Sequence, residues 1–108
     1  MLLPQNGTTS LMLACERGLL PFVRLLLSHG ADVTAEDTDR CTALHLAAKE
    51  GHADVVAELI EAGAVADAPD VGQWTPLTWA CYKGRVEAAR VLVATGSVDL
   101  NVRGQYQV

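Results

Sequence analysis

The cysteines and histidines are the side chains that could act as nucleophiles or metal ligands, and their spacing supports neither role. Cys15, Cys41 and Cys81 form no Cys-x-x-Cys pair, and no histidine recurs beside them at a metal-ligand spacing. The chain also lacks a glycine-rich phosphate loop and a nucleophile elbow. Because no second group is placed to activate a thiol, we expect no enzymatic activity, catalytic residue, metal, cofactor or small-molecule substrate.

Three aromatic residues offer a different chemistry, the attraction between a cation and a ring face. Trp74, Trp79 and Tyr82 lie close together in the chain. We expect Trp74 to be exposed on a turn, where binding a protein would bury a large area and a ring N–H; its alternative role is packing over a neighbouring turn. Trp79 is predicted to lie in the core or on the floor of a groove.

Acidic residues gather in the turn-forming segments. Carboxylates there can attract a basic partner, but Asp often bonds nearby amides within a bend, and we favour that interpretation. The residues are Asp32, Glu36, Asp37, Asp39, Asp67 and Asp70.

The composition describes one small acidic domain. A chain of 108 residues is long enough for one compact unit. A net charge of -5, with eight Lys and Arg residues spread along the chain, argues against nucleic acid and favours a basic partner. No apolar run approaches the roughly 18 to 20 residues that cross a bilayer, so this segment is not expected to insert into a membrane. The unpaired cysteine pattern predicts a reducing compartment, cytosolic or nuclear, of which we take the cytoplasm.

A period of 33 residues positions all of these side chains. Thr9, Thr42 and Thr75 are each 33 positions apart, and five more columns of identical residues share the offset. Such self-similarity is the mark of a repeat architecture. The other columns are Leu11, Leu44 and Leu77; Ala14, Ala47 and Ala80; Gly18, Gly51 and Gly84; Leu26, Leu59 and Leu92; and Gly30, Gly63 and Gly96.

Each column predicts part of a helix pair. The threonines can cap a first helix, and Pro76 follows one of them where its missing N–H costs nothing. The first glycine of each repeat supplies the left-handed residue that ends this helix. Pro21, Asp54 and Glu87 suit the first turn of a second helix, whose buried stripe includes Val55, Val56, Leu59 and Ile60. Cys15 and Cys81 share a column with Ala48, so both are predicted to be buried, and Cys41 alone to be exposed.

The helix-opening sequences resemble the ankyrin repeat at this period. They read Thr42-Ala43-Leu44-His45-Leu46-Ala47 and Thr75-Pro76-Leu77-Thr78-Trp79-Ala80. The resemblance implies an all-α ankyrin-repeat solenoid of three helix-turn-helix units with β-hairpin fingers, filling residues 1–108. The repeats are expected at about 7–39, 40–72 and 73–105, with the start of a further repeat cut off at the C-terminus and a bulge near Ser97.

The resemblance also implies a protein-protein interaction module whose concave surface binds a partner protein. That surface would consist of the finger tips and the exposed side of the first helices. Its candidate residues are Thr38, Asp39, Arg40, Cys41, Lys49, Glu50, Val71, Gly72, Gln73, Trp74, Tyr82 and Lys83. Asn101 occupies the hairpin position that asparaginyl hydroxylases modify in ankyrin proteins, and is a modification candidate.

Two finer resemblances point to different functions. The run Gln73-Trp74-Thr75-Pro76-Leu77-Thr78-Trp79-Ala80-Cys81-Tyr82-Lys83-Gly84-Arg85 resembles the early repeats of the ankyrin-rich membrane-spanning scaffolds that are kinase D substrates. This implies the cytosolic part of a scaffold in neurotrophin and ephrin signalling, with receptor or adaptor tails as partners. The spacing of Trp74 and Trp79 is similar to the ankyrin repeats of histone lysine methyltransferases, which implies a methyl-lysine reader with an aromatic cage, although Tyr82 replaces the acidic residue of that cage. The residues leave both alternatives open.

Overall fold

The structure of the protein is a computed structural model that describes residues 7–95 and 98–100. Over these residues the chain forms six helices and no strand. The helices are α1 (Ser10–Glu16), α2 (Leu20–Ser28), α3 (Ala43–Glu50), α4 (Ala53–Glu61), α5 (Pro76–Tyr82) and α6 (Val86–Ala94). In the same described part, no helix is long and apolar enough to cross a lipid bilayer.

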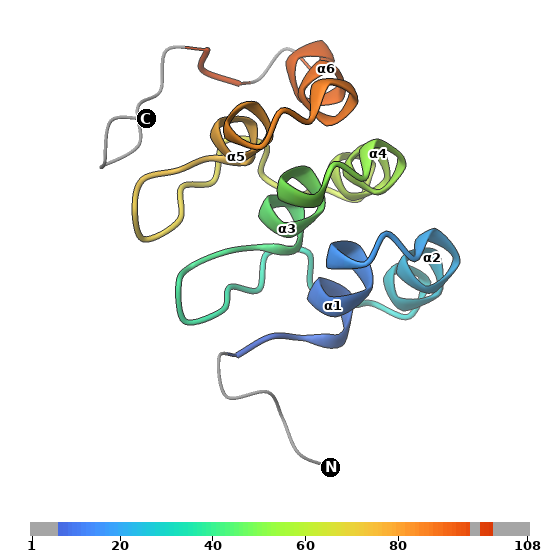
Figure 1. Cartoon of the computed structure of the whole chain (residues 1–108). Coiled ribbons are helices and arrows are strands. Elements are labelled where there is room, and N and C mark those ends of the chain that lie inside the picture. Colours follow the sequence, from blue (N-terminus) through green and yellow to red (C-terminus); the bar gives the residue numbers. More distant parts are fainter. Residues whose placement is uncertain (1–6, 96–97, 101–108) are drawn as a thin grey trace.

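The helices form three antiparallel pairs that stack in two rows. An inner row contains α1, α3 and α5, and an outer row contains α2, α4 and α6 (Figure 1). The loops that lead into α3 and α5 project from the inner row on one side, and we call them the first finger (residues 36–41) and the second finger (residues 69–74) (Figure 1). The predicted helix pairs are therefore confirmed.

Each inner helix begins at a threonine of the 33-residue column. The Thr9, Thr42 and Thr75 Oγ1 atoms accept hydrogen bonds from the amides of Met12, His45 and Thr78 at 3.1, 3.4 and 3.2 Å. These bonds satisfy an amide of the first turn that has no partner within the helix, which stabilises a helix by about 1 kcal/mol. Pro76 follows its cap as the first residue of α5, as predicted. The local sequence is therefore sufficient to predict where each helix of the inner row begins.

The core runs through all three pairs as one apolar seam. The repeated leucines Leu11, Leu44 and Leu77 are all buried and belong to one cluster of packed side chains. Val55, Val56 and Leu59 of α4 are fully buried, while Ile60 is partly buried against them. Since each inner helix packs on the next, every repeat contributes to the burial of its neighbour.

Cys81 departs from its column. Cys15 is fully buried, as predicted, but Cys81 is exposed. Cys15 and Ala48 lie where the following inner helix packs on their own, whereas Cys81 lines an apolar groove of about 670 Å³ along α5 and α6 together with Leu77 and Val86. The prediction that Cys81 is buried was therefore wrong, because burial in this column comes from the next repeat.

The fingers turn tightly without forming the expected strand pairs. In the first finger the Asp37 amide donates to the Cys41 carbonyl at 3.0 Å, but the Cys41 amide donates to Asp37 Oδ1 at 2.9 Å. The second finger repeats this arrangement between Asp70 and Trp74, at 2.8 and 2.9 Å. A carboxylate replaces the backbone carbonyl that would complete a hairpin bond pair, so no ladder begins. The β-hairpin form of the fingers is accordingly not found among the described residues.

A side chain from each later repeat lies over the glycine that ends the preceding inner helix. The His52 Nε2 atom is 3.0 Å from the Glu16 carbonyl oxygen, and Arg85 Nε donates to the Lys49 carbonyl at 3.1 Å. These carbonyls are at helix ends, where no intrahelical donor remains for them. The contacts therefore cap one repeat with a side chain from the next.

Alanine substitutions at Gly18, which lies under His52, and at Gly84, which has no such neighbour, should separate backbone strain from the inter-repeat contact. Gly18 and Gly84 both have a left-handed backbone, with φ of +69° and +72°. A Cβ at Gly18 would lie 2.5 Å from the His52 ring, whereas a Cβ at Gly84 would meet no atom within 4 Å. Both variants should lose about 1 to 2 kcal/mol from left-handed strain. Gly18→Ala should lose more, because the His52 ring must also move.

Urea unfolding of the two variants measures this difference directly, because each unfolding free energy is obtained from the midpoint and slope. Equal losses in Gly18→Ala and Gly84→Ala would show that the His52 contact contributes nothing to stability.

Candidate functional site

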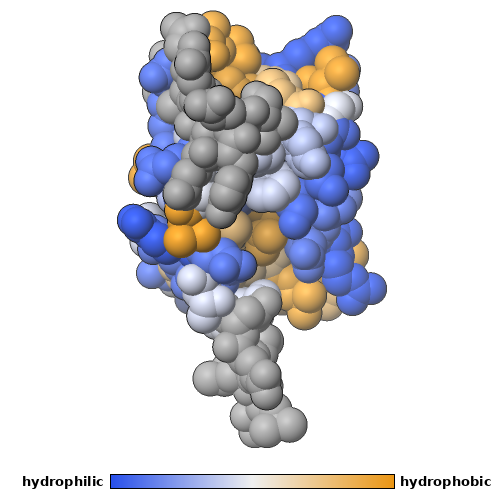
Figure 2. Space-filling model, turned by 60° about the vertical axis from the view of Figure 1, so that its left-hand side comes forward, coloured by the Kyte–Doolittle hydropathy of each residue, from blue (hydrophilic) through white to orange (hydrophobic). Residues whose placement is uncertain are grey.

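The predicted recognition residues lie on the fingers and on α3 and α5. Thr38, Asp39, Arg40, Val71 and Gln73 are exposed on the fingers, and Tyr82 and Lys83 are exposed at the end of α5; Cys41, Lys49, Glu50 and Gly72 are partly buried. We call the side of the molecule that carries them the inner surface. Seen with the finger side turned forward, the molecule shows a mostly hydrophilic surface broken by apolar patches (Figure 2).

Trp74 is buried, and its predicted exposure was wrong. Only 7% of the residue is exposed. Its main chain is held at the base of the second finger, because its carbonyl accepts from the Asp70 amide at 2.8 Å and lies 3.0 Å from His45 Nε2. The ring packs on Trp79 and Tyr82 of α5 instead of projecting from the finger. Its Nε1 atom is buried with no hydrogen-bond partner.

The three aromatic rings meet, as the sequence spacing suggested, but they pack on one another. The Trp74 ring centroid lies 4.5 Å from that of Trp79 and 5.1 Å from that of Tyr82, with the Tyr82 ring edge-on. Trp79 and Tyr82 are 6.2 Å apart. At these separations the rings contact each other directly, so there is no room for an ammonium group between them. Their free faces are what the cluster offers to a ligand.

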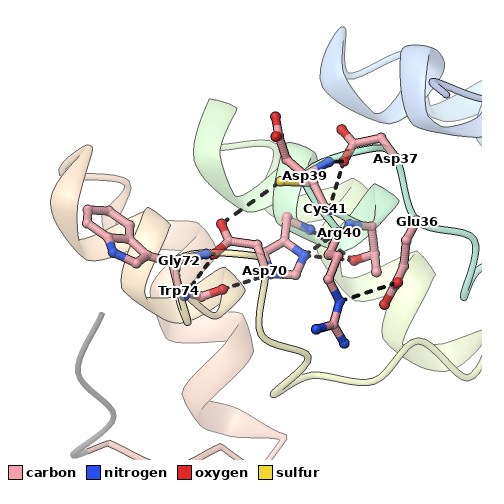
Figure 3. A network of polar contacts seen from close by, with 10 residues as sticks. Glu36, Asp37, Asp39, Arg40, Cys41, Asp70, Gly72 and Trp74 are labelled. Carbon is pink, nitrogen blue, oxygen red and sulfur yellow. Dashed lines mark hydrogen bonds and ion pairs between the residues drawn. The ribbon is translucent and has the colours of Figure 1, made fainter. Parts of the chain in front are cut away.

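Asp70 is the polar centre of the second finger (Figure 3). The residue is 5% exposed, and its Oδ1 atom accepts from the Gly72 and Trp74 amides at 2.9 Å each. Its Oδ2 atom accepts from Trp79 Nε1 at 2.8 Å and lies 4.0 Å from the Cys41 sulfur. One carboxylate therefore fixes the finger turn and the orientation of the Trp79 indole, and joins the two fingers.

The turn-forming role predicted for the acids is confirmed for three of them. Asp32 accepts from the Thr34 amide and hydroxyl, at 2.8 and 2.6 Å. Asp37 accepts from the Asp39 and Cys41 amides, as Asp70 does in the next repeat. The Thr34 hydrogen bonds lower the pKa of the Asp32 carboxyl. These carboxylates shape the loops from within, as short Asx bonds do.

The cysteine beside this network is not suited to nucleophilic chemistry. Burial raises the pKa of the Cys41 thiol to about 12, and the nearby carboxylates of Asp37, Asp70 and Asp39 add to the rise. Burial likewise raises the pKa of Cys15 to about 12. Since the thiolate is the reactive form, both thiols are protonated and inert near neutral pH. Cys41, which was predicted to be exposed, is partly buried.

His45 is a structural residue that ties the second repeat to the second finger. Its Nδ1 atom accepts from the Thr42 amide at 3.0 Å, so the ring proton must be on Nε2, which donates to the Trp74 carbonyl. Burial lowers the pKa of His45, which keeps the ring neutral near pH 7. The neutral ring is the form that can accept and donate at once.

A pocket of about 400 Å³ opens between the two fingers. It joins the first finger, the second finger, α3 and α5. Its lining residues are Asp39, Cys41, Lys49, Asp70, Val71, Gly72, Trp74 and Trp79. Inside it the Lys49 Nζ atom lies 4.9 Å from the centroid of the Trp79 ring, within the range of a cation–π contact. The fingers also touch directly, since the Val71 amide donates to the Asp39 carbonyl at 2.9 Å. We call this cavity the finger pocket.

Sequence comparison assigns the architecture. A family profile of ankyrin repeats, in three copies, matches residues 11–104. The chain belongs to the ankyrin-repeat family. Ankyrin repeats generally serve as protein-protein interaction modules, and domains of this kind are typically binding modules without enzymatic activity. No curated protein matches the chain, so the finer resemblance to kinase D-substrate scaffolds stays a prediction.

Two ankyrin fingers carry a strained residue at the same repeat position. Arg40 and Gln73 are 33 positions apart and have left-handed φ values of 62° and 69°. At such φ values a residue other than glycine is strained by about 1 to 2 kcal/mol. The exposed Arg40 side chain forms a long ion pair with Glu36, at 3.7 Å, which contributes little to stability. Both side chains are thus held outward on the inner surface.

Other candidates fall outside this ankyrin site. Within residues 7–95 and 98–100, no three His, Cys, Asp or Glu side chains gather in a way that could hold a metal ion. Asn101 and the bulge near Ser97 lie outside the described residues. Sequence reasoning placed Asp70 among the turn-forming acids but did not predict that it lines a pocket; the available signal was its place, 33 residues after Asp37 and shortly before two tryptophans.

Proposed function

We propose that the inner surface of this ankyrin domain binds a partner protein, and that the domain is a cytoplasmic segment of a signalling scaffold whose partners are receptor or adaptor tails. The finger pocket carries the proposal, because it combines a concave shape with aromatic, acidic and apolar walls contributed by two repeats. Exposed Val71 and Tyr82 provide further apolar area beside it. A pocket that can bury an aromatic or basic anchor is typical of the energetic centre of an interface.

The cytoplasmic assignment rests on the cysteines. Cys15, Cys41 and Cys81 are all free thiols. Free thiols suit a reducing compartment, where disulfides seldom persist.

Two valines provide a matched test of the inner surface. Val71 on the second finger and Val65 after α4 are 60% and 58% exposed. Val71→Asp adds a charge at the pocket rim, whereas Val65→Asp adds the same charge outside the pocket. Affinity capture with the full chain, read by quantitative mass spectrometry, should lose its bound proteins with Val71→Asp and retain them with Val65→Asp. Identical capture by both variants would refute binding at the inner surface.

Reading of methylated lysine is the second candidate, and the convergence of Trp74, Trp79 and Tyr82 is the observation that favours it. A methylated ammonium would have to take the ring face that Lys49 now covers. Titration of the domain with trimethyl-lysine peptides, followed by tryptophan fluorescence, tests this function. A flat fluorescence response would remove it.

A further inference from the structure

The finger pocket already binds a cation, and that cation belongs to the chain itself. Lys49 extends from α3 and places its ammonium over the Trp79 ring at 4.9 Å from the centroid. The ring is held for this contact, because Trp79 Nε1 donates to Asp70 Oδ2 at 2.8 Å. A hydrogen bond from the indole to a carboxylate fixes the ring face that the cation meets. The pocket is therefore a preformed seat for a positive charge.

The charges around this seat are not balanced. Two carboxylates, Asp39 and Asp70, line the pocket together with one ammonium, that of Lys49. Neither carboxylate forms an ion pair with a basic side chain within the described residues, where the ion pairs join other residues. Asp70 is held entirely by neutral donors. The Cys41 thiol adds no charge, because its pKa is raised to about 12. The pocket thus has an excess of one negative charge.

We infer that the finger pocket takes an arginine side chain of a partner protein, and that Lys49 is an internal competitor that leaves the Trp79 ring when the arginine enters. A guanidinium is flat and can stack on the indole face while its N–H groups reach carboxylate oxygens, which a compact ammonium cannot do equally well. An arginine would supply the positive charge that Lys49 now supplies, and its N–H groups could also pair with a carboxylate that has no ion-pair partner within the described residues. This inference rests on the proposed function and names the partner chemistry for the same site.

The role of Lys49 gives the inference a distinctive test. Lys49→Met keeps most of the side-chain length but removes the competing charge. Arg90→Met removes one positive charge at an exposed position on α6, in the outer row, that does not line the pocket. The probe is N-acetyl-arginine methylamide, titrated into the full chain while the Trp79 indole N–H signal is followed by NMR. We expect a saturable shift of that signal, and about two- to fivefold tighter binding for Lys49→Met. Arg90→Met should match the wild type.

Several outcomes would overturn the inference. One is the absence of a saturable shift in both the wild type and Lys49→Met. Another is an equal gain in affinity for Arg90→Met, which would indicate a general charge effect. Tighter binding of N-acetyl-trimethyl-lysine methylamide than of the arginine probe would replace the inference with methyl-lysine reading. Trp79→Leu, which installs the residue type of Leu46 in the preceding repeat, should abolish the arginine response.

The result is distinguishable from a failure of the proposed function. If Val71→Asp loses captured proteins while the arginine probe fails to bind, the inner surface binds protein by other contacts. If the probe binds and the captured proteins are unchanged by Val71→Asp, the pocket accepts arginine but is not the interface.

Discussion

Leu44→Ala is expected to cost about 2 to 5 kcal/mol of folding stability, the range for removing a large aliphatic side chain from a packed core. Leu44 is fully buried in α3, the middle helix of the inner row, and α3 packs on both α1 and α5. The cavity would therefore open in the helix that packs on both neighbouring repeats. Since small domains are stable by about 5 to 15 kcal/mol, the loss would be a large share of the total.

Leu13→Ala is the matched control for this cavity. Leu13→Ala removes the same atoms from α1, but 48% of Leu13 is exposed. Its replacement should cost well under 1 kcal/mol, as is usual for surface positions. Urea unfolding followed by circular dichroism gives both values. Similar losses for the two leucines would contradict the central placement of Leu44.

Asp70→Ala is expected to cost about 3 kcal/mol and to release the Trp79 indole. The substitution leaves the Trp74 amide, the Gly72 amide and Trp79 Nε1 without their acceptor. A buried donor that loses its partner costs about 1 to 3 kcal/mol, and the Trp74 amide is such a donor. Because the indole would no longer be held, the tryptophan emission should shift to the red. Unfolding titrations read by circular dichroism and by fluorescence measure both effects.

Asp37→Ala provides the comparison within the preceding repeat. Asp37 occupies the same finger position and accepts from two amides, but no indole binds it. Its replacement should cost about 1 to 2 kcal/mol, since two hydrogen bonds of about 0.5 to 1.5 kcal/mol each are lost, with no change in emission. If Asp37→Ala is as damaging as Asp70→Ala, the link from Asp70 to Trp79 contributes nothing to stability.

Local chemistry made the helix pairs predictable from sequence. A threonine caps a helix within three residues of itself, and the glycine that follows ends it within the same short span. Thr42 and Gly51 bound α3 in this way, and no distant residue is needed to explain either end. The 33-residue spacing then predicts the seam, because Leu11, Leu44 and Leu77 must take equivalent places in identical units.

Neighbouring repeats decided the positions that the sequence mispredicted. Trp74 was expected to project from a finger, but the contact of its carbonyl with His45 holds it at the finger base. Cys81 was expected to be buried like Cys15, although that burial comes from the adjoining inner helix. The 33-residue spacing predicts where a residue lies within its own repeat. It does not predict the side chains around that residue, because many of them come from neighbouring repeats.

The finger pocket could not be predicted because its parts come from four separate elements. Lys49 comes from α3, Asp39 and Asp70 come from different fingers, and Trp79 comes from α5. Of these four residues, Asp70 alone has a residue of the same type 33 positions away, namely Asp37. Trp79 replaces a leucine, and only the fold shows that its ring meets a lysine from the preceding repeat. Trp79 was expected in the core or on the floor of a groove, and six other lining residues were expected on the recognition surface without any sign that they form one pocket: Asp39, Cys41, Lys49, Val71, Gly72 and Trp74.

The carboxylate bonds of the fingers have a consequence for how a peptide can be bound. Asp37 and Asp70 occupy amides that an ordinary hairpin would use between its strands. Over the described residues there is consequently no strand edge to which an extended chain could add by β-augmentation, and no such edge for fibril-like association. We therefore expect a bound segment to be recognised mainly through its side chains. Scrambling its sequence at constant composition should therefore abolish binding, even where its extended conformation is preserved.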